Sequence, residues 1–148
     1  MAYDYKQGIF KPNHPDKYRG DVNNIIYRSG WEKRVMDWCD TNKNVVSWSS
    51  EEIIIPYISP VDNRPHRYFV DFYVEALDRD GKKVVYLLEV KPKGQTQEPK
   101  VQKRKTKRYI TEVVTWGVNQ AKWKAAEEFC KDRGWTFRLI TETDLFKM

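Results

Sequence analysis

Residues 67–91 decide the fold of this chain, and their sequence is RYFVDFYVEALDRDGKKVVYLLEVK. Side chains of Arg67–Ala76 alternate in direction and are rich in aromatic and β-branched types, which predicts a β-strand. Asp78–Gly81 has turn composition, and Lys83–Lys91 predicts a second strand, so the stretch forms a hairpin. Alternation assigns Tyr68, Val70, Phe72 and Val74 to one face of the first strand.

Two acids lie inside these apolar strands, where β-propensity disfavours them, namely Asp71 and Glu89. If the hairpin is symmetric about Asp80, the two carboxylates stand directly opposite each other, with Cβ atoms about 5 Å apart. Like charges placed in this way destabilise the sheet unless something neutralises them. Lys91 follows on the same face, and two carboxylates with a lysine form an oxygen-ligand site for Mg²⁺. The alternative is an ordinary structural ion pair, in which Lys91 balances Glu89 and Asp71 stays unmatched.

A helix precedes the hairpin and supplies a third acid. Ser29-Gly30-Trp31-Glu32 fits the capping-box pattern, and apolar residues then recur at helical spacing until about Thr41-Asn42. On a helical wheel Glu32 falls within the apolar arc, so its side chain is expected to face inward. Glu32 is therefore a candidate ligand as well as a capping residue, since a carboxylate has two oxygens.

The remaining segments complete an α/β pattern. Residues 1–28 are polar and turn-rich and are expected to form an extended N-terminal arm, while residues 29–148 form a single domain. Val45–Trp48 and Glu52–Ile58 are expected to be extended. A long helix should begin near Thr106 or Thr111 and end at Arg133, where Gly134 closes it, before a last strand at Trp135–Ile140 and a short turn at Thr141–Phe146. The order helix, three strands, helix, strand predicts a mixed sheet of four to five strands flanked by helices.

Composition limits the class of protein. The chain has 148 residues and a net charge of +6, which suits one soluble domain. No apolar run approaches the ~20 residues of a membrane helix, so no membrane partner is expected. Two cysteines indicate no disulfide scaffold, and with two histidines they form no zinc spacing.

The positive charge is concentrated directly after the hairpin. Residues 91–108 hold eight basic residues and one acid, so the rest of the chain is almost neutral. Such a stripe indicates a polyanion, most simply nucleic acid, although a solvated lysine-rich loop is the alternative. The candidate DNA-binding residues are Arg28, Lys93, Lys100, Lys103, Arg104, Lys105, Lys107 and Arg108.

Asp71, then Glu89-Val90-Lys91, after a helix bearing Glu32, resembles the PD-(D/E)xK nuclease superfamily, with Val70 in place of the leading proline. The resemblance implies a restriction-endonuclease-like core, with Glu32, Asp71 and Glu89 as ligands of Mg²⁺ (Mn²⁺ as a substitute) and Lys91 as the catalytic lysine. The superfamily often places a polar residue on the second core helix. Gln120 is therefore a further catalytic candidate, the alternative being an amide at the edge of the core.

The segments at residues 27–32, 50–57, 67–72 and 89–92 look more closely like the head-completion nucleases of T-even-type tailed phages. The likeness runs from about Asp16 to Gly134. It implies a metal-dependent DNA endonuclease that acts on packaged DNA ends, in the host cytoplasm during virion assembly or in the virion, with phage head or portal proteins as partners. The pattern is also similar to TnsA-like transposon endonucleases and to junction-resolving endonucleases. A junction-resolving enzyme and a non-catalytic DNA-binding head protein are the alternatives, and the oligomeric state is open.

Overall fold

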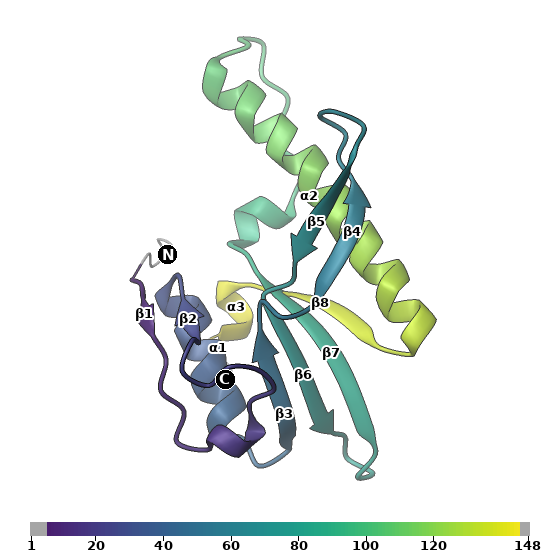
Figure 1. Ribbon diagram of the computed structural model, residues 1–148. Coiled ribbons are helices and arrows are strands. Elements are labelled where there is room, and N and C mark those ends of the chain that lie inside the picture. The colour runs from purple at the N-terminus through teal and green to yellow at the C-terminus, as the bar shows by residue number, and fades with distance from the viewer. Residues whose placement is uncertain (1–5, 146–148) are drawn as a thin grey trace.

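The computed structural model describes residues 6–145, and a four-stranded sheet lies at its centre (Figure 1). The sheet order is β3 (Val45–Ser50), β6 (Phe72–Leu77), β7 (Lys83–Val90) and β8 (Thr136–Ile140). Strand β8 runs parallel to β7, and the other neighbours are antiparallel, so the expected mixed sheet is confirmed. With helices α1 (Gly30–Thr41) and α2 (Lys107–Arg133), the core order is α1, β3, β6, β7, α2, β8, which is the predicted order of helix, three strands, helix and strand.

Within residues 6–145, three α-helices flank this sheet, and local capping sets the bounds of the two long ones. Helix α1 (Gly30–Thr41) begins after Ser29, whose hydroxyl accepts a hydrogen bond from the Glu32 N–H. Helix α2 (Lys107–Arg133) begins after Thr106, which accepts from the Tyr109 N–H, and ends at Gly134 in the left-handed conformation. Helix α3 (Glu142–Leu145) is a single turn. These bounds confirm the predicted cap at Ser29 and the predicted end at Gly134. Of the two predicted starts of the long helix, Thr106 is the one observed.

The prediction of one continuous strand over Arg67–Ala76 is wrong. The chain bends at Val70 and Asp71, and the segment before the bend is β5 (Pro65–Phe69), which pairs with β4 (Ile54–Ile58) in a separate two-stranded sheet. The Val70 N–H bonds the Ile53 carbonyl, while the Asp71 carbonyl accepts from the Glu51 N–H of the central sheet, so the chain changes sheets within two residues. Aromatic and β-branched residues continue through the bend, so propensity gives no sign of it.

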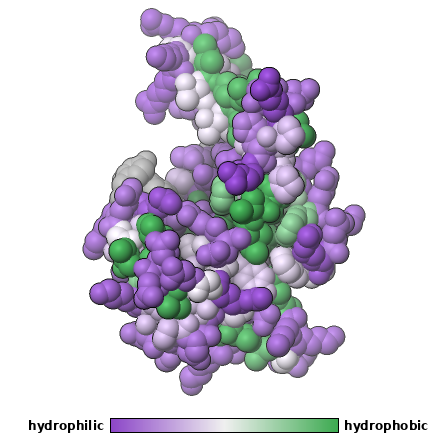
Figure 2. All heavy atoms as spheres, viewed as in Figure 1, coloured by the Kyte–Doolittle hydropathy of each residue, from purple (hydrophilic) through white to green (hydrophobic). Residues whose placement is uncertain are grey.

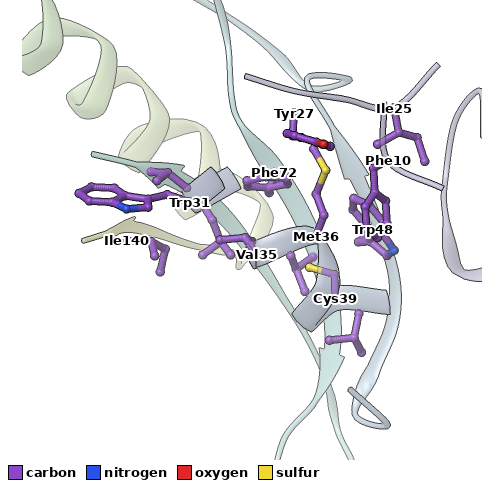
Figure 3. Close-up of a cluster of buried hydrophobic side chains, with 14 of the residues drawn as sticks. Phe10, Ile25, Tyr27, Trp31, Val35, Met36, Cys39, Trp48, Phe72 and Ile140 are labelled. Atoms are coloured by element: carbon purple, nitrogen blue, oxygen red, sulfur yellow. The ribbon is translucent and has the colours of Figure 1, made fainter. Parts of the chain in front are cut away.

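The bend also divides the face that alternation assigns to Tyr68, Val70, Phe72 and Val74. Phe72 and Val74 belong to one buried cluster, whereas Tyr68 and Val70 belong to the other. The first cluster lies between α1 and the sheet, and Figure 3 shows Val35, Met36 and Cys39 of α1 facing Trp48 and Phe72. The second lies between α2, the other face of the sheet and the β4–β5 hairpin. The hairpin therefore belongs with α2.

Residues 6–28 pack on the first cluster, although they contain little regular structure. They include β1 (Gly8–Ile9), which pairs with β2 (Ile26–Tyr27), and a 3₁₀ turn, η1 (Pro15–Lys17). Phe10, Tyr18 and Ile25 are buried there, and Figure 3 shows Phe10 and Ile25 close to Trp48. Asp40, 2% exposed, accepts hydrogen bonds from two backbone N–H groups of this segment. The described part of the N-terminal region is thus part of the folded body rather than a separate arm.

The first turns of α2, with the loop before them, project beyond the sheet (Figure 1). Ile110, Val113 and Val114 are exposed on this part, where Figure 2 shows green hydrophobic side chains among hydrophilic ones. Helix α2 is long but carries many charges, and no helix within residues 6–145 meets the length and hydropathy needed to cross a membrane.

Candidate active site at the sheet edge

The topology of the central sheet brings four chain segments to one edge. Because β3 and β7 are both antiparallel to β6, the end of β3, the start of β6 and the end of β7 lie together. Glu51 follows β3, Asp71 precedes β6, and Glu89 is the last residue but one of β7. The N-terminal turn of α1 adds Glu32. Acids from four separate elements therefore meet at this edge.

Asp71 and Glu89 have the relation that the hairpin predicts. Phe72 is paired with Leu88 in the β6–β7 ladder, so the next position outward sets Asp71 against Glu89. The Asp71 carboxylate accepts a hydrogen bond of 2.8 Å from the Val90 N–H. Burial, and then the Glu89 carboxyl beside it, raise the pKa of Asp71 well above its ordinary value. The crowding of two acids without a neutralising partner is thus present in the folded chain.

Glu32 forms the predicted cap with Ser29, and its carboxylate also lies beside the other acids. Its N–H donates to the Ser29 hydroxyl at 3.1 Å, and that hydroxyl donates to Glu32 Oε2, also at 3.1 Å. The side chain is buried at 6% exposure, and an oxygen of its carboxylate lies near those of Asp71 and Glu51. Burial raises the pKa of Glu32, while the Ser29 hydrogen bond opposes the rise. The cap therefore fixes the orientation of an acid that faces the site.

Glu51 belongs to the site, although sequence reasoning did not single it out. Its backbone is in the left-handed region, with φ at 56°. Single oxygens of Glu32, Glu51 and Asp71 all lie within 4.8 Å of one another. The guanidinium of Arg28 holds the Glu51 carboxylate through two hydrogen bonds of 3.0 and 3.2 Å, which raise the pKa of Arg28. The segment Ser50-Glu51-Glu52 is part of the pattern on which the resemblance rests, but alternation does not tell which acid turns inward.

The donor set fits a hard divalent cation. Two oxygens bound to one such ion at about 2.1–2.4 Å lie at most about 4.2–4.8 Å apart, and the three carboxylate oxygens meet that limit. Glu89 lies beside Asp71 and is 5% exposed. All these candidate donors are carboxylates, which suit a hard cation such as Mg²⁺ or Mn²⁺ rather than a softer metal. The described cysteines, Cys39 and Cys130, are buried in the two apolar clusters.

Lys91 directly follows β7, and its N–H bonds the Ile140 carbonyl at 2.9 Å, which extends the parallel ladder. The residue is half-buried, and its ammonium group makes no hydrogen bond or ion pair with any residue from 6 to 145. The simple ion pair of Glu89 with Lys91, the alternative from the sequence, is therefore absent from the described residues. Lys91 thus lies two residues after Glu89 in the chain, without an ion-pair partner among the described residues.

Gln120 and its neighbour Asn119, both on helix α2, differ in burial. Gln120 is exposed, in a hollow that it shares with Trp116 and Trp123, so it lies on the expected side of the helix but outside the core. Asn119 is instead buried at 6% exposure and lines a cavity of about 400 Å³ with Gly94. The 3₁₀ turn η2 (Lys93–Thr96), two residues after Lys91, thus lies beside Asn119. Hydrophobic periodicity does not distinguish which of two adjacent helix residues, here Asn119 and Gln120, faces inward.

Residues 91–108, here called the basic segment, run from the site onto the projecting part of the molecule. It passes through η2 (Lys93–Thr96) and a loop into the first turn of α2, which Figure 1 shows above the sheet. Within it, Arg108 pairs with Glu112 at 3.3 Å, and the Lys105 ammonium lies over the Tyr109 ring. The exposed basic residues of the segment are Lys93, Lys100, Lys103, Arg104, Lys105, Lys107 and Arg108.

Comparison with known proteins gives two findings. Residues 42–142 match the family described as TnsA-like endonuclease N terminal, a span that contains Asp71, Glu89 and Lys91. The chain is also 40% identical over 149 residues to the head completion nuclease of Enterobacteria phage T4. That similarity covers 98% of this chain and 95% of the relative.

Proposed function

Because this chain belongs to the TnsA-like endonuclease N-terminal family, we propose that it is a metal-dependent DNA endonuclease of a tailed phage. The observation that carries the proposal is the meeting of Glu32, Asp71 and Glu89 at the sheet edge where Lys91 begins the basic segment. Its likeness to a head completion nuclease supports action on packaged DNA ends in the infected cell, beside head or portal proteins.

The proposed ligands of the cation are Glu32, Asp71 and Glu89. When bound, a divalent cation supplies positive charge to a phosphodiester oxygen and lowers the pKa of a water molecule. The Ser29 hydroxyl keeps Glu32 turned toward the site, and the Val90 N–H does the same for Asp71. Both hydrogen bonds favour the carboxylate form that a cation requires.

Lys91 provides the second positive charge of the proposed mechanism. Its ammonium, which has no partner among the described residues, can hold the attacking water or offset the charge that gathers on the phosphate in the transition state. Its backbone is fixed by the hydrogen bond to Ile140, so the side chain starts from a rigid point. The lysine therefore acts on the substrate rather than as a structural ion pair.

Cleavage assays test the activity directly. We expect the wild type to cut linear, circular or four-way-junction DNA with Mg²⁺ or Mn²⁺, and not with EDTA. Glu89→Gln and Lys91→Met should each lose at least about 100-fold in rate, because removal of a positioned charge in a site of this kind is worth about that much. Matched controls are Glu128→Gln and Lys43→Met, which change exposed residues outside the site.

Each outcome of these assays distinguishes between the candidate functions or tests the site. Failure of the wild type to cut any of the substrates with either metal would refute the enzyme and support a DNA-binding head protein. Cleavage by Glu89→Gln at the wild-type rate would leave the activity standing and remove the site. Strong preference for the four-way junction would favour the junction-resolving alternative over an enzyme of DNA ends.

The basic segment is proposed to hold the DNA backbone. Each lysine that contacts a phosphate steepens the dependence of affinity on salt, by a slope of about 0.9 for duplex DNA. Lys103→Gln should therefore weaken DNA binding for every sequence and reduce that slope by about one unit. Lys82→Gln, at the turn of the β6–β7 hairpin away from the site, should change neither. Equal effects of the two substitutions would show that charge alone, not this segment, determines binding.

A further inference from the structure

We propose that Glu51 is a further ligand of the active-site cation, and that Arg28 occupies Glu51 only until the cation binds. The guanidinium would then be released to hold a phosphate of the DNA. The inference rests on the proposed function, whose metal site it extends. It goes beyond that function because the metal ion would replace the arginine as the positive charge beside Glu51.

The position of Glu51 is set by the backbone. Left-handed φ is uncommon for a residue other than glycine, and the surrounding structure must hold it. Here the Glu51 N–H donates to the Asp71 carbonyl at 3.1 Å, one step beyond the pairing of Ser50 with Phe72. This turn brings the Glu51 carboxylate to within 4.8 Å of oxygens from both Glu32 and Asp71. A strand continuing without the turn would carry its next side chains past the site.

The charge balance at the edge is incomplete without a further cation. Four acids meet there. Of these four, Glu51 forms an ion pair within the described residues, and its partner is Arg28. Arg28 contacts Glu51, whose side chain is 32% exposed, while Glu32 and Glu89 are 6% and 5% exposed and have no basic partner among residues 6–145. Buried acids without counter-charge are unstable unless they bind a proton or a metal.

An independent observation also indicates a missing ligand. The Tyr68 hydroxyl is buried, with the side chain 3% exposed, and has no hydrogen-bond partner of acceptable geometry within residues 6–145. It faces the carboxyl groups of Glu89 and Asp71. A polar group buried in this way is costly, and a bound ion or water is one of the partners that can satisfy it. The unsatisfied hydroxyl and the unneutralised acids lie together.

Arg28 is suited to the second half of the exchange. Its side chain is 57% exposed, so it can turn away from Glu51 without opening the core. It precedes Ser29, the cap of the helix that carries Glu32, and so begins beside the site. The planar guanidinium binds a phosphate through two parallel hydrogen bonds, as it now binds the carboxylate. When the cation takes Glu51, the phosphate becomes the best remaining partner.

Calorimetric titration of the full chain with Mn²⁺, without DNA, tests the ligand assignment. Glu51→Gln should weaken Mn²⁺ binding by at least about tenfold, as does loss of groups that support a metal site. Arg28→Gln should instead tighten binding, by up to about fivefold, because the cation no longer competes with an exposed ion pair. The matched control, Glu52→Gln, changes the exposed neighbouring acid and should leave affinity unchanged.

The opposite signs separate this proposal from a structural ion pair. If the pair only stabilises the fold, both substitutions lower thermal stability alike and neither changes Mn²⁺ affinity, which overturns the proposal. A misfolded Glu51→Gln protein does not rescue that outcome, because tighter binding by Arg28→Gln is an independent requirement. Wild-type protein that neither binds Mn²⁺ nor cuts DNA would refute the proposed function itself. A wild type that does both, beside a Glu51→Gln variant that binds Mn²⁺ equally well, refutes only this inference.

DNA binding tests the release of Arg28. In a Lys91→Met background, which should keep the DNA intact, Arg28→Gln should reduce DNA affinity several-fold more in Mg²⁺ than in EDTA. Equal losses in the two conditions would mean that Arg28 contacts DNA whether or not a cation is bound, and would refute the exchange.

Discussion

Replacement of Asp71 by asparagine should stabilise the metal-free protein and remove the stabilisation that Mg²⁺ gives it. Asp71 lies opposite Glu89 at the start of the β6–β7 ladder, and burial together with that neighbour raises the pKa of Asp71. Asparagine has nearly the same shape but cannot carry the charge. The substitution therefore removes a repulsion that only a cation or a proton relieves.

The size of the effect follows from the register. Side chains directly opposite in an antiparallel pair are about 5 Å apart, and two unit charges at that distance repel by about 3 kcal/mol at an effective dielectric constant of 20. The hydrogen bond from the Val90 N–H weakens when its acceptor becomes neutral, by about 1 kcal/mol. The net gain in unfolding free energy is at most about 2 kcal/mol, or about 4–8 °C in Tm for a domain of this size.

The gain should depend on pH in a fixed direction. A carboxyl group whose pKa is raised in the folded state favours folding while it is protonated in both states, and that contribution is lost as pH rises through the raised pKa. Wild type and Asp71→Asn should therefore be nearly equal below about pH 4, the ordinary range for an unfolded aspartate. The variant should become the more stable protein toward neutral pH.

Thermal unfolding in EDTA between pH 4 and pH 8, repeated with Mg²⁺, measures both effects. A cation at 100 times its Kd should stabilise the wild type by about 2.7 kcal/mol and the variant by much less, so the order of stability reverses. Asp80→Asn, at the exposed turn of the same hairpin, is the control and should show neither effect. A variant less stable than wild type at pH 7 in EDTA would show that Asp71 and Glu89 do not repel, and the reasoning would fail.

Three further substitutions, two of them paired with a control substitution, test local features of the fold. Ser29→Ala should cost about 1 kcal/mol in unfolding free energy through loss of the α1 cap and should also weaken Mn²⁺ binding, whereas Thr106→Ala should cost as much at α2 without changing Mn²⁺ affinity. Phe10→Ala should destabilise by about 3–5 kcal/mol in urea unfolding, while Ile9→Ala, at 62% exposure, should stay within about 0.5 kcal/mol; equal losses would contradict the packing of the N-terminal region. Gly134→Ala should lose about 1 kcal/mol in thermal unfolding, because its φ of 71° disfavours a side chain.

Features of this protein that depend on neighbours along the chain are determined by the sequence. The helix caps at Ser29 and Thr106 and the glycine at position 134 involve residues at most five apart, so their pattern is visible in the sequence. The register of Asp71 with Glu89 follows from a short turn, which leaves little freedom in pairing. The basic segment is a property of composition alone.

Tertiary structure decided the features that depend on contacts between distant segments. The break at Asp71 exists because β5 pairs with β4 while β6 pairs with β3 and β7, and strand propensity is the same on both sides. The burial of Phe10 depends on packing against Trp48. Glu51 joins the site through a positive φ that is stabilised by the Asp71 carbonyl, a partner 20 residues away. Periodicity predicts which face a residue occupies within one helix or strand. The positions of Asp71, Phe10 and Glu51 depend instead on contacts between different elements, which periodicity does not describe.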